Sequence, residues 1–344
     1  MKRMRKGTFI VAMILIISVF LTACSGNTTD SGTGDESTGA GDTDSIVLKL
    51  GHVVDANNAW HKAALKFGEI VEEKTDGEIT VEVFPSSSLG NDRDLVEGMQ
   101  MGTVDMGLIA GVLGNFYEPI QLLELPYIFN DQEHLRKVIY GDVGEQIKEG
   151  LYEEANIVGL EFWERSPRQT TSNKEINTVE DLDGLKIRVP EIPPMVSAWK
   201  AMGANPTPMA FGEVYTGLQQ GTIDAQENPL SNIVAAKIEE VQTHIANTNH
   251  VYGYVMHVMS GSTWNKLTPE QQEIVREAAA EAREYQNSLV EEEEKELEKY
   301  LQDKGIIFTN PELEGFKAKA QSVHDEFADQ FGRDIYNAII EAGK

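Results

Sequence analysis

The 344-residue sequence contains a single cysteine, Cys24, so no disulfide framework can form within the chain. Basic residues are also scarce, because 29 lysines and arginines face 56 acidic residues and the formal net charge is −27. This excess of negative charge argues against a nucleic-acid-binding protein and against direct adhesion to anionic lipid. It does not exclude an anionic ligand, since a few buried arginines can dominate a closed pocket while the surface charge is screened.

Sequence motifs for catalysis and for metal binding are missing as well. The seven histidines are scattered without HExxH-like spacing, and neither a GxSxG motif nor a phosphate-binding loop occurs. No cluster of metal ligands stands out, and carboxylate pairs are expected by chance in so acidic a chain. We therefore expect no cofactor, no metal and no enzyme activity.

The N-terminal segment has the features of an export signal. Four basic residues among the first six precede an apolar run over residues 9–21, which is too short and wrongly flanked for an ordinary membrane span. The small residues directly before Cys24 resemble a bacterial lipobox. We expect residues 1–23 to be removed and the Cys24 thiol to be lipidated, which would anchor the protein outside the cell membrane. A buried core cysteine is the alternative, but no core lies near this position.

The segment that follows is predicted to be a flexible tether, residues 24–45. It consists almost wholly of serine, glycine, threonine and aspartate, and it cannot bury enough apolar surface to offset the entropy of ordering. The remaining part, about 300 residues, is too long to fold around a single hydrophobic core, so two lobes are expected.

Hydrophobic periodicity predicts a strand–helix–strand unit at the start of the folded part. Residues 46–52 and 78–84 alternate as strands, and apolar residues recur at helical spacing from Trp60 to Val71. Asn57 or Asn58 can cap this helix. Because parallel strands need such a crossover, we expect an α/β fold. Further helices are predicted at 95–101 and 132–154, and further strands at 104–110, 157–163 and 251–259.

The longest helical signal begins at Thr268, a good N-cap residue. Pro269 occupies the favoured first position and Gln271 completes a capping box. Helical composition continues to about Lys304, and a straight helix of that length would span roughly 55 Å. Since this exceeds one small domain, we expect the helix to bend and to run across both lobes.

Residues 183–229 can place three different functional groups around one cleft. A strand over Leu185–Val189 alternates apolar and basic residues, and Pro190 stops it. Arg188 therefore lies near the carboxyl end of its strand, where open α/β sheets bind ligands. Helices are predicted at 195–202 and 211–220, and the segment 204–208 between them is too rich in proline to be helical. Phe211 and Asn228 can thus converge with Arg188.

Four segments of this region also carry a family resemblance. They are RQTTSN at 168–173, DLDGLKIRVP at 181–190, GANPTPMAFGEVYTGLQQG at 203–221 and DAQENP at 224–229. In this order and at these separations they closely resemble the solute-binding subunits of TRAP transporters, the DctP-type family. A weaker resemblance extends from about residue 46 to the end of the chain.

The resemblance implies both an architecture and a role. The implied fold is a two-lobed α/β fold, periplasmic-binding-protein-like and class II-like, with lobe I at 46–165 plus 254–293 and lobe II at 166–253 plus 294–344. The implied role is that of a monomeric extracytoplasmic receptor, which captures a small organic acid and delivers it to a separate, cation-driven membrane permease. Closure of the two lobes around the ligand would exclude water and strengthen its charge-assisted hydrogen bonds.

The matching positions imply ligand-binding residues. In the family, the arginine of the KIRVP strand clamps the ligand carboxylate, which implies this role for Arg188; from the residue alone, a structural arginine paired with an acidic neighbour is as good a reading. The RQTTSN match implies a second pocket arginine, Arg168. The QENP match favours Asn228 as a ligand contact over a turn residue, and Phe211 matches an aromatic that packs against ligand, although a core position is its alternative. Weaker candidates are Asp92, which could instead cap the following helix, and His52, Trp60, Trp163 and Glu164.

The identity of the ligand is narrowed by one departure from the family pattern. Members that bind sialic acid carry an acidic residue in the strand corresponding to Val104–Ala110, where this chain has Ala110. Sialic acid is therefore in doubt, and a sugar acid such as a hexuronate is the first expectation, with a C4-dicarboxylate second. Other hypotheses are an ABC-type binding protein, a receptor that presents its ligand to a membrane sensor kinase, and an extracellular lyase or hydrolase acting on sugar acids.

Overall fold

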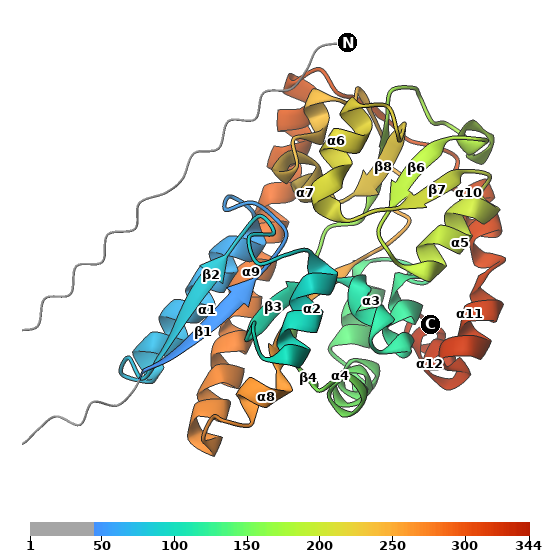
Figure 1. Cartoon of the computed structure of the whole chain (residues 1–344). Coiled ribbons are helices and arrows are strands. Elements are labelled where there is room, and N and C mark those ends of the chain that lie inside the picture. The colour runs from blue at the N-terminus through green and yellow to red at the C-terminus, as the bar shows by residue number, and fades with distance from the viewer. Residues whose placement is uncertain (1–44) are drawn as a thin grey trace, which may run out of the picture. The chain divides into compact units, whose positions relative to one another are not determined.

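The computed structural model describes residues 45–344, which lie in one compact unit, Thr43–Lys344. The expected signal segment 1–23, the expected lipidation site Cys24 and the tether up to residue 44 lie outside the described residues. The described part contains two β-sheets with helices packed on both (Figure 1). The prediction of a two-lobed α/β fold is confirmed.

The first sheet has five strands in the order β2-β1-β3-β10-β4. β1 pairs in parallel with β2 and β3, whereas β10 runs antiparallel between β3 and β4. Its strands are β1 (Ile46–Gly51), β2 (Ile79–Phe84), β3 (Met106–Ile109), β4 (Ile157–Glu164) and β10 (Tyr254–Ser260).

The second sheet has six strands in the order β11-β9-β5-β8-β6-β7. β6 pairs in parallel with β7 and β8, and β5 runs antiparallel to β8 and β9. Its strands are β5 (Gln169–Ser172), β6 (Lys186–Val189), β7 (Asn205–Pro208), β8 (Ala225–Asn228), β9 (His244–Ala246) and β11 (Ile307–Thr309).

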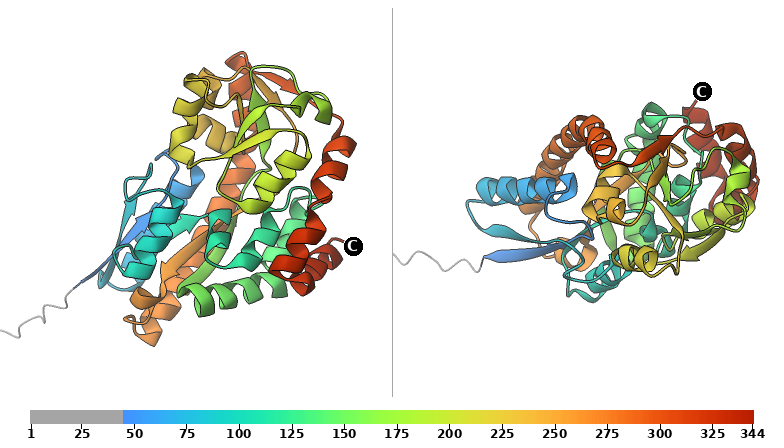
Figure 2. Two further views of the ribbon diagram at one scale, coloured as in Figure 1. Left: turned by 45° about the vertical axis from the view of Figure 1, so that its right-hand side comes forward. Right: turned by 90° about the horizontal axis from the view of Figure 1, so that it is seen from above.

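The α-helices α1 and α9 begin where the sequence predicts. The Asn58 side chain caps α1 (Ala59–Lys74) by accepting a hydrogen bond from the Trp60 N–H at 3.0 Å. Thr268 and Gln271 form the expected capping box of α9 (Pro269–Asp303), whose 35 residues pack against α1 and β4 of the first lobe and α7 of the second. The long helix therefore crosses both lobes, as predicted (Figures 1 and 2). None of the helices described between residues 45 and 344 is both long and apolar enough to cross a membrane.

The remaining helices are short. The α-helices are α2 (Asp92–Met101), α3 (Gln132–Ile139), α4 (Asp142–Ala155), α5 (Pro193–Ala201), α6 (Val214–Gln219), α7 (Leu230–Ala235), α8 (Gly261–Trp264), α10 (Leu313–Gln321), α11 (His324–Phe331) and α12 (Arg333–Ala342). The 3-10 helices are η1 (Gly111–Asn115), η2 (Glu118–Glu124), η3 (Val179–Leu182), η4 (Phe211–Glu213) and η5 (Ile238–Glu240).

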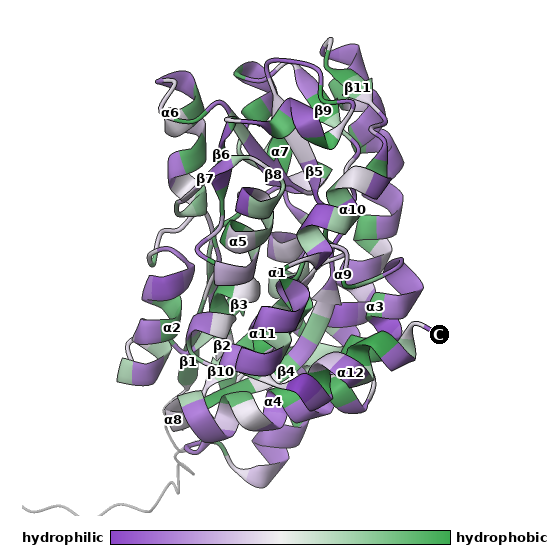
Figure 3. Cartoon of the chain, turned by 90° about the vertical axis from the view of Figure 1, so that its right-hand side faces the viewer, coloured by the Kyte–Doolittle hydropathy of each residue, from purple (hydrophilic) through white to green (hydrophobic). Residues whose placement is uncertain are grey.

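Two parts of the fold contain elements that the sequence analysis did not predict. The proline-rich segment 204–208 contains a strand, β7. A strand is possible here because β7 lies at the edge of the sheet and pairs only with β6, so the N–H groups that its prolines lack are not needed for the ladder. The chain after residue 304, for which no elements were predicted, adds β11 and three helices. Of these, α10 packs on α5, whereas α12 packs on α3 and α4 (Figure 1). Both hydrophilic and hydrophobic residues occur along α12, as expected for a helix with one buried face (Figure 3). The lobe limits inferred from the sequence stay a prediction.

Two extended segments connect the sheets and lie side by side. Residues 165–168 lead from β4 to β5, and residues 247–253 lead from β9 back to β10. The Arg165 N–H donates to the Gly253 carbonyl at 3.0 Å, and the Arg168 N–H donates to the Val251 carbonyl at 2.9 Å. This pairing fixes the backbone from which two arginines project into the site.

Candidate functional site

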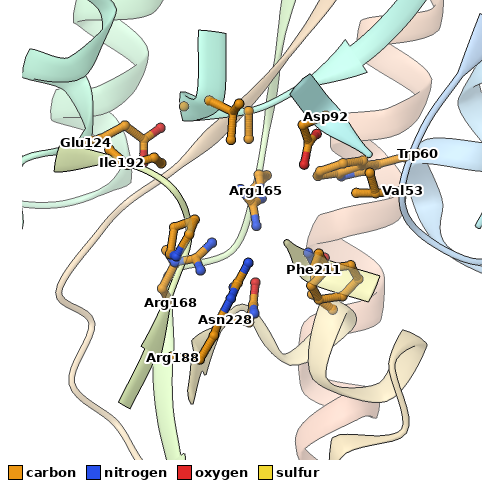
Figure 4. A pocket seen from close by; sticks show the side chains of 15 residues that line it. Val53, Trp60, Asp92, Glu124, Arg165, Arg168, Arg188, Ile192, Phe211 and Asn228 are labelled. Atoms are coloured by element: carbon orange, nitrogen blue, oxygen red, sulfur yellow. The ribbon is translucent and has the colours of Figure 1, made fainter. Parts of the chain in front are cut away.

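A cavity between the two sheets contains most of the residues that the sequence analysis singled out (Figure 4). Six of the predicted residues line it: Trp60, Asp92, Arg168, Arg188, Phe211 and Asn228. Ala110, where the sequence departs from sialic-acid-binding members, lines it too.

The second sheet delivers three of these residues from neighbouring strands. Arg168 directly precedes β5, Arg188 lies in β6, and Asn228 ends β8, which runs between β5 and β6. In the ladder, Gln169 pairs with Asn228, and Arg188 pairs with Gln226. The strand-end argument made from the sequence concerned Arg188, which lies one residue before the end of β6. Arg168, which precedes the antiparallel β5, and Asn228 reach the same edge of the sheet.

Arg188 is a buried arginine whose protein acceptor is a carbonyl group. Its Nε and Nη2 atoms donate to the Met209 carbonyl at 2.9 and 2.6 Å, and its exposed fraction is 3%. Within residues 45–344 no carboxylate lies at ion-pair distance from it, so the reading of a structural ion pair finds no partner there. Burial lowers the pKa of Arg188 to about 10, which still leaves the guanidinium charged at neutral pH.

Arg168, in contrast, already holds a carboxylate of the protein. Its Nε donates to one oxygen of Glu227, and its Nη2 donates to the other at 2.7 Å. His250 Nε2 also donates to Glu227 at 2.8 Å, while its Nδ1 accepts from the Thr248 hydroxyl at 2.9 Å. Burial alone would raise the pKa of Glu227, but Arg168 and His250 lower it to about 2. Burial lowers the pKa of His250, so this imidazole is neutral.

The sequence analysis missed Glu227 and His250. Glu227 lies inside the QENP motif, yet its role depends on Arg168, 59 residues earlier in the chain. The structure shows all four residues of β8, Ala-Gln-Glu-Asn, to be buried although three of them are polar, and the polar sequence of this segment does not indicate that burial. A polar strand that is buried on both faces must satisfy its side chains in a hydrogen-bond network.

Arg165 is a third cavity arginine that the sequence analysis did not predict. It is 6% exposed, its Nε has no hydrogen-bond partner, and its guanidinium lies 5.2 Å from the ring centroid of Trp60. Burial, together with the nearby Arg168, lowers the pKa of Arg165 to about 9. Such an arginine, held against an aromatic ring with unused donors, is a candidate binding group.

Two acidic side chains of the first lobe also line the cavity, Asp92 and Glu124. Asp92 begins α2, but the capping box of that helix is made by Asn91 and Asp94, which leaves the Asp92 side chain free of the capping role. Burial raises the pKa of Asp92 to about 6 and raises the pKa of Glu124 as well. Glu124, at the end of η2, was not a predicted candidate.

Three weaker candidates lie outside the cavity. The His52 ring contacts His61, with Nε2 and Nδ1 3.0 Å apart, and it is buried directly after the end of β1. The Trp163 indole packs in the core 5.3 Å from His257. Glu164 accepts hydrogen bonds from Arg136 Nε at 2.8 Å, from the Tyr140 hydroxyl and from Gln132 Nε2. Trp163 and Glu164 do not reach the cavity because β4 continues through Glu164. Arg165, the next residue, is the one that lines the cavity.

The described residues also give no sign of a metal centre, since residues 45–344 contain no group of three or more histidine, aspartate or glutamate side chains placed to hold a metal ion. The cavity therefore offers charged donors, carboxylate acceptors, two carboxamides (Asn228 and Asn232) and two aromatic rings. Such a lining can bind and orient a small polar anion.

Comparison with known proteins identifies the family. Residues 50–330 match the family model described as bacterial extracellular solute-binding protein, family 7 (DctP). A solute-binding protein of Roseobacter denitrificans is 46% identical over 276 residues, which cover 80% of this chain and 85% of that protein. The crystal structure of a TRAP periplasmic solute-binding protein from R. denitrificans, with bound L-galactonate, superposes with a TM-score of 0.82 at 43% identity, covering 87% of this chain and 99% of the other.

Two further crystal structures of TRAP periplasmic solute-binding proteins carry different acids. One, from Pseudomonas putida F1 with bound D-glucuronate, is 29% identical with a TM-score of 0.83 and covers 86% of this chain and 96% of the other. The other, from Shewanella oneidensis with bound succinate, is 30% identical with a TM-score of 0.84 and covers 87% of this chain and all of the other. The chain belongs to the DctP family of bacterial extracellular solute-binding proteins, the solute-binding subunits of TRAP transporters.

Proposed function

We propose that this protein is an extracytoplasmic receptor that captures a sugar acid, such as a hexuronate or an aldonate, in the cavity between its sheets and delivers it to a TRAP permease. The observation that carries the proposal is Arg188, a buried guanidinium in the cavity whose protein acceptor is a single carbonyl group. An arginine fork offers two parallel donors that match a carboxylate, and it stays charged at any relevant pH.

The other cavity residues support a ligand that has hydroxyl groups besides its carboxylate. Asn228 can both donate and accept, Asp92 can accept, and Trp60 and Phe211 can pack against a sugar ring or carbon chain. L-galactonate and D-glucuronate, the acids held by two of the similar structures, have this composition. The succinate held by a third makes a C4-dicarboxylate the second candidate.

In the proposed mechanism Arg188 takes the ligand carboxylate while Arg168 stays in place through Glu227. Closure of the lobes about the segments 165–168 and 247–253 excludes water, and the lower local dielectric strengthens each charge-assisted hydrogen bond. We infer that the closed form is what the permease recognises. The lobe assignments, 46–165 plus 254–293 and 166–253 plus 294–344, are part of this proposal.

The proposal extends to location and assembly. The family is a substrate-binding component of transporters, and we infer that this chain carries out no reaction of its own. We also infer that it acts as a monomer, tethered to the membrane by a lipid on Cys24. Mass spectrometry of the protein isolated from membranes tests the anchor, because a lipidated Cys24 would be the first residue of the mature chain.

A thermal-shift panel tests the ligand class. A ligand that binds only the folded state raises the melting temperature by mass action, by about 2.7 kcal/mol of stability at a concentration 100 times its Kd. The purified protein, unfolded and refolded to release any bound solute, is heated with uronates, aldonates, sialic acid and C4-dicarboxylates. Stabilisation by one or more sugar acids supports the proposal; stabilisation by C4-dicarboxylates alone would replace it with the second candidate, and a panel with no response would refute it.

A further inference from the structure

The three arginines of the cavity differ in what they already hold. Arg168 and Glu227 form a closed ion pair, and Arg188 holds a carbonyl group. Arg165 has an unpartnered Nε and contacts the Trp60 ring. Among residues 45–344 neither Asp92 nor Glu124 forms a salt bridge, and Glu124 interacts with the buried Tyr254 hydroxyl. Besides the proposed clamp Arg188, the cavity thus contains one arginine and two carboxylates that can form further hydrogen bonds with a ligand.

Gly111 leaves the space that the Glu124 side chain occupies. A Cβ atom on Gly111 would lie 2.3 Å from Glu124 Cδ and 2.4 Å from its Oε1. The carboxylate can therefore lie against the backbone of η1 only because residue 111 has no side chain. In the view of Figure 4 the Arg165 side chain appears between those of Glu124 and Asp92, and both carboxylates attract its guanidinium.

The charged groups of the cavity are intermingled, and their sum limits the charge of the ligand. The three arginines and the carboxylates of Asp92, Glu124 and Glu227 sum to zero formal charge. Asp92 interacts with Arg188 and Arg165, and Glu124 interacts with Arg168 and Arg165. One ligand carboxylate brings the total to −1, and a second carboxylate would add a further negative charge to a cavity that already contains Asp92 and Glu124.

We propose that Arg165, Asp92 and Glu124 bind the hydroxyl groups at the far end of the ligand and thereby restrict the receptor to acids with a single carboxylate. This inference rests on the proposed function, because it takes the Arg188 end as the carboxylate end. Each carboxylate accepts a hydrogen bond from a hydroxyl group, and Arg165 donates to the same or a neighbouring hydroxyl oxygen. Aldarates and C4-dicarboxylates are rejected by like-charge repulsion, a form of specificity that needs no added contact to the preferred ligand.

The sharpest test compares L-galactonate with galactarate, which differ only in that a primary alcohol at C6 is replaced by a carboxylate. Titration calorimetry at pH 7.5 on the refolded protein should show galactonate binding at least about 30-fold more tightly. In Glu124→Gln, which keeps the size of the side chain and removes its charge, the ratio of the two affinities should fall about tenfold. Asp92→Asn should shift the ratio in the same direction.

Matched controls remove a charge elsewhere on the same elements. Glu118→Gln alters an exposed residue of η2, the helix that ends at Glu124, and Glu97→Gln alters an exposed residue of α2, the helix that begins at Asp92. Both controls should leave the ratio within about twofold of the parent value. Melting temperatures without ligand establish that each variant is folded.

The outcomes separate this inference from the proposed function. If the parent binds galactarate as tightly as galactonate, or if Glu124→Gln and Asp92→Asn weaken both acids equally, the charge-selection inference is wrong while the sugar-acid receptor stands. If the parent binds neither acid nor any other sugar acid, the proposed function fails and this inference fails with it. Should Glu124→Gln not fold, the parent ratio and the Asp92→Asn ratio still decide.

Discussion

Replacing Arg188 by alanine should weaken binding of a sugar acid by about 30-fold to several thousand-fold. The guanidinium is 3% exposed, so the ligand carboxylate that it would hold is shielded from water when the lobes close. Removing one partner of a buried, hydrogen-bonded charge pair costs about 2–5 kcal/mol, much of it the penalty of leaving the other charge unpaired. Calorimetry with the acid identified in the thermal-shift panel measures this loss directly.

The same substitution should change the stability of the unliganded protein by much less. Burial lowers the pKa of Arg188 to about 10, which means that the folded state disfavours its charge by an amount on the order of a few kcal/mol. Alanine removes this cost together with the two hydrogen bonds to the Met209 carbonyl, and the two effects oppose each other. If Arg188 were a structural arginine, its replacement by alanine would instead cause a large loss of stability and little change in ligand affinity.

Two further variants complete the experiment. Lys186→Ala removes an exposed cation two residues earlier on the same strand and should leave affinity within about twofold. Arg188→Lys keeps the charge but loses the planar fork, so an intermediate loss of about tenfold is expected. If Arg188→Ala binds the acid within about threefold of the parent, the clamp assignment is wrong.

Two other predictions concern stability. Glu227→Ala leaves Arg168 buried without its carboxylate and should lower the free energy of unfolding by about 3–5 kcal/mol, measured by urea denaturation without ligand; a loss under about 1 kcal/mol would contradict the ion-pair account. Stability should also fall with acid, because burial lowers the pKa values of His52 and His257 to about 3 and the unfolded chain therefore binds protons first as pH falls below about 6.5. Each histidine contributes a slope of about 1.4 kcal/mol per pH unit between those pKa values, and His257→Leu should remove one such contribution.

The elements that sequence reasoning placed correctly are those with local signals. Asn58 caps α1, and Thr268 with Gln271 caps α9, through hydrogen bonds that span only two or three residues. Arg188 follows from the alternation of one short strand ended by Pro190. In each case the information that fixes the structure lies within a few positions of the residue concerned.

The missed residues depend on contacts between distant parts of the chain. Arg165 reaches the cavity because its backbone pairs with Gly253, 88 residues later, while Glu124 reaches it through the space left by Gly111. No periodicity within β4 could show that the strand ends one residue before an arginine that lines the cavity. Trp60 and Asp92 of the first lobe were predicted from the sequence, whereas Arg165 and Glu124 needed the three-dimensional structure.

The strong negative charge of the protein leads to a last prediction, on the rate at which an anionic ligand binds. Without residues 1–23, which hold four basic and no acidic residues, the formal charge is −31, so the long-range field repels an anion even though the cavity holds three arginines. Salt screens exposed charges over about 10 Å at 0.1 M, whereas the buried arginines keep their attraction for a bound carboxylate.

Raising the ionic strength from 0.01 to 0.15 M should therefore speed association of the sugar acid several-fold and leave its dissociation rate nearly unchanged. Stopped-flow tryptophan fluorescence can follow the reaction, since Trp60 lines the cavity. A neutral sugar of similar size, mixed with the protein at each ionic strength, serves as the control for effects of salt on the fluorescence itself. If salt instead slows association, the field of the arginines extends beyond the mouth of the cavity and outweighs the charge of the whole protein. In that case surface charge does not set the association rate, and this prediction is wrong.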